Sequence, residues 1–231
     1  MYEARLRETV PQVRERIARA AERVGRTEAD VTVVAVTKGH PPEAAQSAIA
    51  AGLRCLGENR VQELEAKRAA LGDGAEWHLI GHLQRNKARS AIPLFSLLHS
   101  LDSIRLAEAL ATEAERTGVQ VPVLVQVNAS GEGTKSGVAV EEAIEMVAKI
   151  VEMPTLVVRG LMTMAPFTDE ASILRSTFRR TREAFDRCAA AVPGFEARHL
   201  SMGMSNDFEI AIQEGSNMVR LGTILFGERV K

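Results

Sequence analysis

The sequence has few cysteines to cross-link the chain and no long apolar run to place it in a membrane. Cys55 and Cys188 are the two cysteines among 231 residues, and neither lies in a CxxC pair or another metal-ligand spacing. Without a disulfide framework, a reducing compartment is the ordinary setting for such a chain. The segment Met1–Arg5 lacks the apolar core of a signal peptide, and no apolar run approaches the length of a membrane span. The sequence therefore predicts a cytoplasmic protein without a membrane segment.

Charge gives equally little reason to expect a polyanionic partner. The chain has 29 Lys and Arg against 30 Asp and Glu, for a formal net charge of −1 at pH 7. A balanced chain has no overall attraction to nucleic acid or to an anionic membrane surface, so neither is predicted as a partner. The length of 231 residues suits one α/β domain over 1–231.

Apolar runs typical of strands alternate with amphipathic segments typical of helices. A first helix is predicted over 2–24, where Leu6, Val10, Val13, Ile17 and Val24 recur at helical spacing. The predicted strands are 31–38, 54–57, 76–81, 95–100, 121–128, 155–162, 198–201 and 217–225. The predicted helices between them are 42–52, 59–71, 84–91, 103–117, 140–152, 170–191 and 206–214.

This alternation predicts the fold class. Successive strands begin about 27 residues apart, which suits βα units and a parallel sheet. Eight such units favour a single (β/α)8 TIM-like barrel with an additional N-terminal helix. A doubly wound open sheet is the alternative, but it usually has a glycine-rich loop after its first strand, and Thr37–Pro41 is not one.

Lys38 ends the apolar run 31–37 and is the first candidate functional residue. A strand this apolar is buried on both faces, and an ammonium group at its end is costly unless it is used or paired. An amine in such a place loses its proton more easily and can then attack an aldehyde to form a Schiff base. The alternative is a lysine that ends a strand and reaches into water.

Polar residues gather where the predicted strands end. In a barrel these ends converge on one mouth, so their side chains are expected to share a site. The strand-end segments are Gly57–Arg60, Gly81–Gln84, Ser100–Asp102, Gln126–Asn128, Gly160–Thr163, Ser201–Ser205 and Arg220–Thr223.

Two of these segments have the composition of a phosphate cradle. Ser201–Asp207 offers hydroxyls, small residues and a helix start, and Arg220–Thr223 offers a cation, a glycine and a hydroxyl. The alternative is helix capping plus a buried structural arginine. With Lys38, a phosphate cradle suggests pyridoxal 5'-phosphate (PLP) or a sugar-phosphate aldolase, whose proton shuttle would be Glu58 or Asp102. The arginine favours PLP, because it could point at the pyridine nitrogen.

Six segments resemble, in the same order, the YggS/PROSC family of PLP homeostasis proteins. They are Val34–Lys38, Gly57–Glu63, Trp77–Lys87, Arg159–Met162, Leu200–Ser205 and Gly215–Thr223. The resemblance implies the PLP-binding barrel of the alanine racemase N-terminal domain, with PLP held as a covalent aldimine on Lys38 and Arg220 facing the pyridine nitrogen. The other implied contacts are Ser201, Gly222 and Thr223 at the phosphate and Asn59 and Met204 near the ring.

The chain departs from the family pattern directly after the lysine. Many members continue Thr-Lys-Pro there, whereas this chain has Gly39, His40 and Pro41. A second lysine would favour a neutral Lys38 amine by like-charge repulsion, and that help is absent.

His78 and His82 are four residues apart. Gly81 lies between them at a strand exit, which disfavours a zinc site. His82 is instead a candidate for contact with the cofactor, and His78 for a hydrogen bond in the core.

The resemblance favours a non-catalytic role in PLP buffering or delivery, with PLP-dependent apoenzymes as possible partners. The alternative is an amino-acid racemase of the same barrel class, which needs a base on each face of its intermediate. The chain has one tyrosine, Tyr2, and no predicted second domain to supply another. A closed barrel has no sheet edge that forces pairing, so a monomer is expected.

Overall fold

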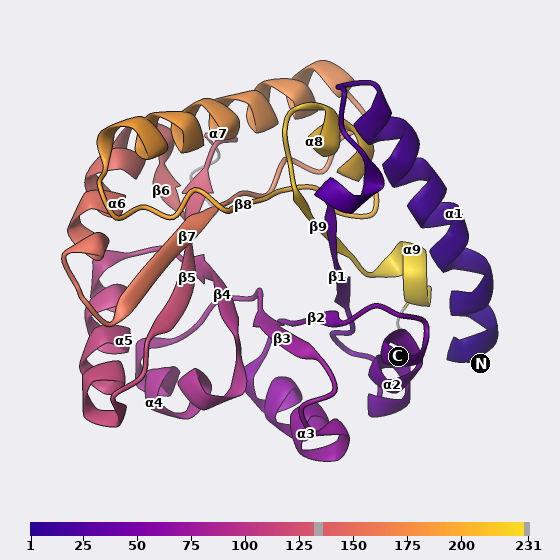
Figure 1. Ribbon diagram of the computed structural model, residues 1–231, viewed down its shortest axis with the longest axis horizontal. Helices are drawn as coiled ribbons and strands as arrows, with labels where there is room; N and C mark the ends of the chain where they lie inside the picture. The colour runs from indigo at the N-terminus through magenta and orange to yellow at the C-terminus, as the bar shows by residue number, and fades with distance from the viewer. Residues whose placement is uncertain (132–135, 229–231) are drawn as a thin grey trace.

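Parallel strands close into a barrel with the helices outside it (Figure 1). The computed structural model describes residues 1–131 and 136–228. Within these residues the strand order is β4-β3-β2-β1-β9-β8-β7-β5, and pairing of β4 with β5 closes the ring. The barrel strands are β1 (Thr32–Val36), β2 (Cys55–Glu58), β3 (Glu76–Leu79), β4 (Leu97–Leu101), β5 (Val121–Asn128), β7 (Leu156–Met162), β8 (His199–Ser201) and β9 (Met218–Leu221). The predicted (β/α)8 TIM-like barrel is confirmed.

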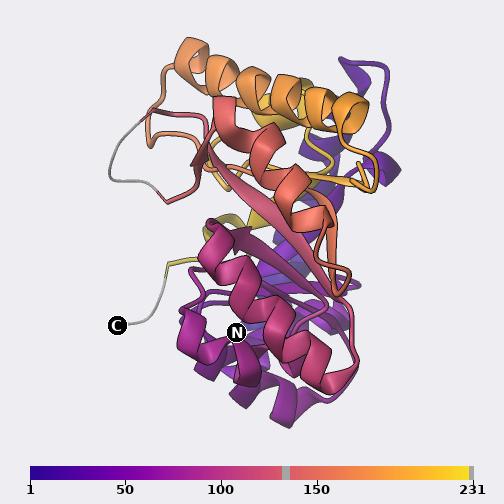
Figure 2. The same cartoon turned by 90° about the vertical axis from the view of Figure 1, so that its left-hand side faces the viewer.

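The helices lie against the outside of the strands, as the side view shows (Figure 2), and they bury apolar side chains there. In α5, for example, Leu106, Ala107, Leu110, Ala111 and Ala114 are buried. The α-helices are α1 (Tyr2–Glu22), α2 (Pro42–Ala50), α3 (Val61–Leu71), α4 (Ala88–Ala91), α5 (Ile104–Thr117), α6 (Ala143–Val151), α7 (Ala171–Ala191), α8 (Phe208–Gln213) and α9 (Thr223–Phe226). Short 3-10 turns occupy 28–30, 85–87, 92–94 and 140–142.

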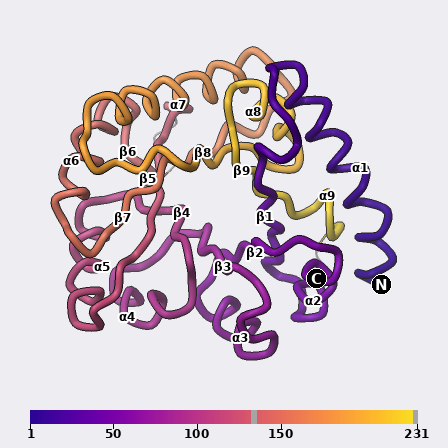
Figure 3. Tube along the Cα trace, viewed as in Figure 1, coloured from indigo at the N-terminus to yellow at the C-terminus, as the bar shows by residue number. Residues whose placement is uncertain are grey.

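The N-terminal helix α1 lies beside α8 and α9, the last helices of the described chain (Figure 3). It packs against α8 and α9, and four of its predicted apolar positions, Leu6, Val10, Val13 and Ile17, are buried. The fifth, Val24, lies beyond the end of the helix and is 41% exposed, so the predicted helix 2–24 is two residues too long. Arg16 on α1 also pairs with Glu209 on α8, with Nη2 and Oε2 2.7 Å apart. The helix therefore covers the part of the barrel where the first and last strands meet.

The last predicted strand, 217–225, is too long. The chain leaves the sheet after Leu221, and Thr223–Phe226 forms the short helix α9. The apolar run 224–226 looks like a strand by composition, but Leu225 and Phe226 are buried in α9, which packs against α1. The two-residue strand β6 (Val138–Ala139), which pairs with the end of β5, was not predicted.

Two expectations concern membrane segments and loop mobility. In the part of the chain that the structure describes, no helix has the length and apolarity needed to cross a membrane. The composition of the loop 129–137 predicts a flexible segment, and its residues 132–135 lie outside the described residues.

Gly160 marks a close approach between β7 and β8. Its φ is +149°, and a Cβ built there would lie 1.8 Å from the carbonyl oxygen of His199. We expect Gly160→Ala to lower the free energy of unfolding by more than about 3 kcal/mol, because backbone on both strands must move. Gly118 is a matched control, since its φ is +67° but no atom lies within 4 Å of its built Cβ. Gly118→Ala should cost about 1 kcal/mol. Urea unfolding of both variants checks this, and equal losses would contradict it.

Candidate functional site

One cavity at the carboxyl ends of the strands gathers most of the predicted site residues. Its volume is about 420 Å³, and its wall is built by the ends of β1, β2 and β9 and by the loops after β3, β7 and β8. The predicted residues on the wall are Lys38, Asn59, His82, Met204, Arg220, Gly222 and Thr223. Side chains more than 180 positions apart in the sequence therefore face one space, as the barrel topology requires.

Ser201 is the predicted residue that does not line this cavity. It is fully buried in β8, and its Oγ accepts a hydrogen bond from Arg220 Nη1 at 2.7 Å. The same Oγ lies 3.1 Å from Nδ1 of His99. The serine thus supports the cavity wall from behind.

Arg220 carries a buried positive charge at the cavity. Its side chain comes from β9 and donates from Nη1 to the Ser201 carbonyl at 2.9 Å and from Nη2 to the Thr163 carbonyl at 2.8 Å. Among the described residues, no carboxylate lies within 4.0 Å of the guanidinium. Burial lowers the pKa of Arg220 to about 10, and the charge of Asp207 partly opposes this. A buried cation so placed would gain from an acceptor in the cavity.

The backbone on either side of Lys38 is held by ion pairs and hydrogen bonds. Lys67 Nζ donates to the Thr37 carbonyl at 2.7 Å and pairs with Glu58, whose side chain is fully buried. On the other side, the Gly39 N–H donates to Glu63 Oε2 at 2.8 Å. Burial raises the pKa of Glu58, against hydrogen bonds from Lys67 and Thr37. Glu58 therefore anchors the end of β1 and does not line the cavity.

His82 and Asp102 form a pair at the rim of the mouth. His82 Nδ1 lies 3.1 Å from Asp102 Oδ2, and the His82 side chain is 61% exposed. Asp102 lines a neighbouring hollow and not the Lys38 cavity. Neither carboxylate considered for an aldolase therefore faces the space in front of Lys38.

The sequence analysis missed two groups of cavity residues. One is Asp207, which is buried, accepts the Met204 N–H, and has its pKa raised by burial. The other is the loop 164–168 after β7, in which Phe167 is 93% exposed. Asp207 ends the segment 201–207 that was considered for phosphate, but a carboxylate is not a residue expected to bind an anion. The loop 164–168 has no polar pattern to mark it.

His78 and His82 are not brought together. The His78 ring lies inside the barrel, and its Nδ1 is 3.0 Å from Nε2 of His99. His78 therefore makes a hydrogen bond in the core, as predicted. A possible metal-binding group elsewhere consists of Cys55, Glu76 and His78. Each offers one ligand atom, and these three atoms lie within 4.8 Å of one another. Burial raises the pKa of the Cys55 thiol to about 12, which disfavours the thiolate that metals bind.

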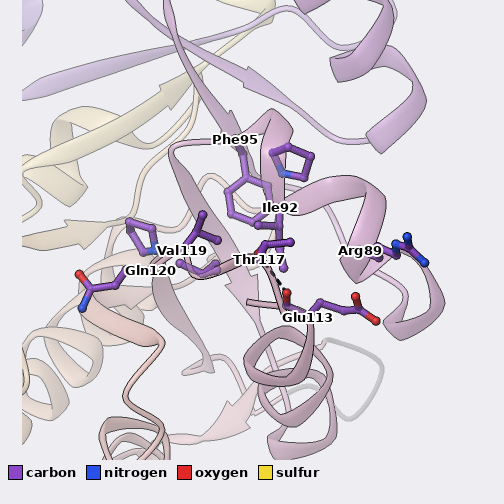
Figure 4. A pocket seen from close by; sticks show the side chains of 10 residues that line it. Arg89, Ile92, Phe95, Glu113, Thr117, Val119 and Gln120 are labelled. Carbon is purple, nitrogen blue, oxygen red and sulfur yellow. Dashed lines mark hydrogen bonds between the residues drawn. The ribbon is translucent and has the colours of Figure 1, made fainter. Parts of the chain in front are cut away.

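A second hollow lies at the opposite end of the barrel (Figure 4). It is formed before β4 and β5 by Ile92, Phe95, Thr117, Val119 and their neighbours, and has a volume of about 260 Å³. None of the predicted site residues lines it. The polar strand ends therefore distinguish the Lys38 cavity as the candidate site.

Comparison with known proteins gives the family. The model of the alanine racemase N-terminal domain matches residues 10–230, and the chain belongs to this family. A protein of Aquifex aeolicus called pyridoxal phosphate homeostasis protein is 42% identical over 227 residues, which cover 96% of this chain and 97% of the relative.

Two solved structures share the whole barrel. A protein from Bifidobacterium adolescentis, described as unknown, is 37% identical with a TM-score of 0.93, covering 97% of this chain and 96% of the other. PipY of Synechococcus elongatus, solved with PLP bound, is 36% identical with a TM-score of 0.81 and covers 93% of this chain and 100% of its own.

The two buried histidines make folding sensitive to acid. Burial lowers the pKa of His78 to about 4 and that of His99 well below its usual value. Between about pH 6.5 and about pH 4, the unfolded chain binds a proton at His78 that the native state excludes, so this stabilisation is lost as the pH falls, and His99 acts in the same direction. The expected slope is about 1.4 kcal/mol per pH unit for each histidine.

Glu58 and Asp207 act in the opposite direction, because burial raises their pKa values. The comparison of variants is therefore the decisive measurement. Urea unfolding from about pH 7 to about pH 5 should give a smaller slope for His99→Asn than for the parent protein. His82→Ala, at the exposed rim, should keep the parent slope. Equal slopes in all three proteins would contradict the prediction.

Proposed function

We propose that this protein binds PLP in the Lys38 cavity and takes part in PLP homeostasis. The observation that carries the proposal is an amine and a buried guanidinium on the wall of one cavity, the guanidinium having no carboxylate within 4.0 Å among the described residues. The Aquifex relative bears the name of that function, and PipY has been solved with PLP bound.

The residues of the wall fit the parts of this cofactor. The Lys38 amine would condense with the aldehyde, forming a C=N bond and releasing water. Arg220 would donate to the pyridine nitrogen and so gain the acceptor that its burial calls for. Gly222 and Thr223 would bind the phosphate, and a Cβ at Gly222 would lie only 3.3 Å from the Val36 carbonyl oxygen, so the backbone approaches closely there.

The remaining predicted residues have supporting places. Asn59, His82 and Met204 line the cavity and would contact the ring. We assign Ser201 to holding Arg220 and not to the phosphate, because its hydroxyl is buried and already contacts the guanidinium. Bound in this way, the reactive aldehyde would be kept from stray amines.

The proposal is a carrier and not a racemase. A racemase needs a second base opposite Lys38. The Tyr2 hydroxyl lies 3.2 Å from His40 Nδ1, and Tyr2 does not line the cavity. We therefore propose a cytoplasmic monomer that buffers PLP or delivers it to apoenzymes.

Reduction of the loaded protein tests the covalent link. With PLP and borohydride, we expect one pyridoxyl adduct, located on Lys38 by peptide mass spectrometry. Lys38→Ala should lose the adduct and the long-wavelength absorbance while remaining folded. Lys87→Ala, a lysine near the same mouth that does not line the cavity, is the matched control and should keep both. An adduct on another residue, or none, would overturn the proposal.

Turnover separates the carrier from the racemase. The loaded protein, incubated with L-alanine and other L-amino acids, should form D-isomers far more slowly than about one per second, the lower end of ordinary enzyme rates. Chiral chromatography measures the product, with a true alanine racemase as positive control. Turnover at about one per second or faster would establish the racemase instead.

A further inference from the structure

Four buried side chains lead from the cavity into the interior of the barrel. Arg220 contacts Ser201, Ser201 contacts His99, and His99 contacts His78, at 2.7, 3.1 and 3.0 Å. The residues belong to β9, β8, β4 and β3, and none is more than 4% exposed. Since β4 and β8 are not neighbours in the sheet, the contact between His99 and Ser201 spans the interior of the barrel.

Both histidines in this line are neutral at ordinary pH. His99 has its pKa lowered by burial first and then by His78, Arg220 and His199. For His78 the causes are burial and then His199. A neutral imidazole has one donor nitrogen and one acceptor nitrogen. A ring that accepts a hydrogen bond at one nitrogen therefore donates at the other, so the direction of one hydrogen bond fixes the direction of the next.

Counting donors and acceptors gives the direction of each hydrogen bond from Arg220 to His78. Arginine only donates, so Ser201 Oγ must accept from Arg220. If the Ser201 hydroxyl donates to Nδ1 of His99, then Nε2–H of His99 donates to Nδ1 of His78, and the Ser201 hydroxyl and both ring nitrogens of His99 are satisfied. In the reverse arrangement, Ser201 Oγ accepts from both neighbours. Its own hydrogen then has no acceptor among the contacts that the described residues show. A buried donor left unmade is costly, which favours the first arrangement.

We propose that His99, acting through Ser201, is a positioning residue for the Arg220 guanidinium. The inference rests on the proposed binding of PLP, since it concerns the group that would meet the pyridine nitrogen. Nδ1 of His99 accepts a hydrogen bond from the Ser201 hydroxyl, and this orients the lone pairs of the Ser201 oxygen toward Nη1 of Arg220. His78 accepts from Nε2 of His99 and thereby fixes the tautomer that makes this possible.

The guanidinium needs this support because its other partners are few. Within the described residues it is held by the carbonyls of Ser201 and Thr163 and by the Ser201 hydroxyl oxygen, without a carboxylate beside it. Loss of the hydroxyl contact leaves Nη1 with one acceptor. The guanidinium plane is then less well fixed against the cavity that it lines together with Lys38.

Two amide variants of His99 test the proposal, because they preserve different ends of the imidazole. His99→Asn keeps an acceptor near the position of Nδ1 and so keeps the contact with Ser201. His99→Gln places its amide near the position of Nε2, keeping the contact with His78 and losing the one with Ser201. PLP retention by equilibrium dialysis and the absorbance maximum of the loaded protein are measured for both.

We expect His99→Gln to weaken retention about 10-fold, the value of one hydrogen bond to a charged group, and to shift the absorbance maximum in the same direction as Arg220→Ala. His99→Asn should stay within about threefold of the parent, with an unshifted maximum. His199→Gln, at the start of β8 and outside the chain of contacts, is the control and should match the parent. The double variant His99→Gln/Ser201→Ala should retain PLP no worse than Ser201→Ala alone.

The outcomes separate this inference from the proposed function. If the parent protein does not retain PLP, the proposed function fails. If the parent retains PLP and Arg220→Ala weakens it, but the two amides behave alike or the double variant is additive, the positioning role of His99 is wrong. Far-ultraviolet circular dichroism of each variant shows whether it is folded. Should His99→Gln not fold, Ser201→Ala must by itself shift the absorbance maximum for the proposal to stand.

Discussion

The arrangement of the site depends on a guanidinium buried in the barrel, which among the described residues has no carboxylate within 4.0 Å. Arg220 is 4% exposed, and burial lowers its pKa to about 10. Its charge is stabilised by carbonyl groups at the ends of β7 and β8 and by one hydroxyl. An aspartate in contact would neutralise the charge of Arg220, but it would also occupy the face of the guanidinium that a ligand needs. The fold instead leaves the cation satisfied on one side and open to the cavity on the other.

The strand register explains why such a cation can face Lys38. Arg220 pairs with Val34 across β9 and β1, and Lys38 follows four residues after Val34 at the same end of the barrel. A parallel ladder brings the ends of neighbouring strands to one edge, so the two groups share a wall although they are 182 positions apart. The remaining strands contribute in the same way, with Asn59 directly after β2 and Gly222 directly after β9.

The sequence predicted the parts of the molecule that repeat, and missed those that depend on a single contact across the barrel. Alternation of apolar runs and amphipathic segments was sufficient for the closed parallel barrel, and strand ends were sufficient for most of the cavity wall. His99 was missed because it looks like one more residue in the apolar strand 97–101, and its partner Ser201 is 102 positions away. The end of β9 was misjudged because Ile224–Phe226 is apolar in both a strand and a packed helical turn.

The two residues after Lys38 have a structural role in this chain. Gly39 has a φ of +72°, a conformation that glycine adopts without strain. His40 is 8% exposed, meets the Tyr2 hydroxyl on α1 and lies with its ring centroid 5.5 Å from that of Phe226 on α9.

His40 thus forms an aromatic contact with both the first and the last described helix. Lys67 and Glu63 hold the backbone at Thr37 and Gly39, and His40 is held by the two helices. The Lys38 side chain therefore extends from a backbone fixed on both sides, so that the four-carbon stem supplies the motion needed to reach an aldehyde in the cavity.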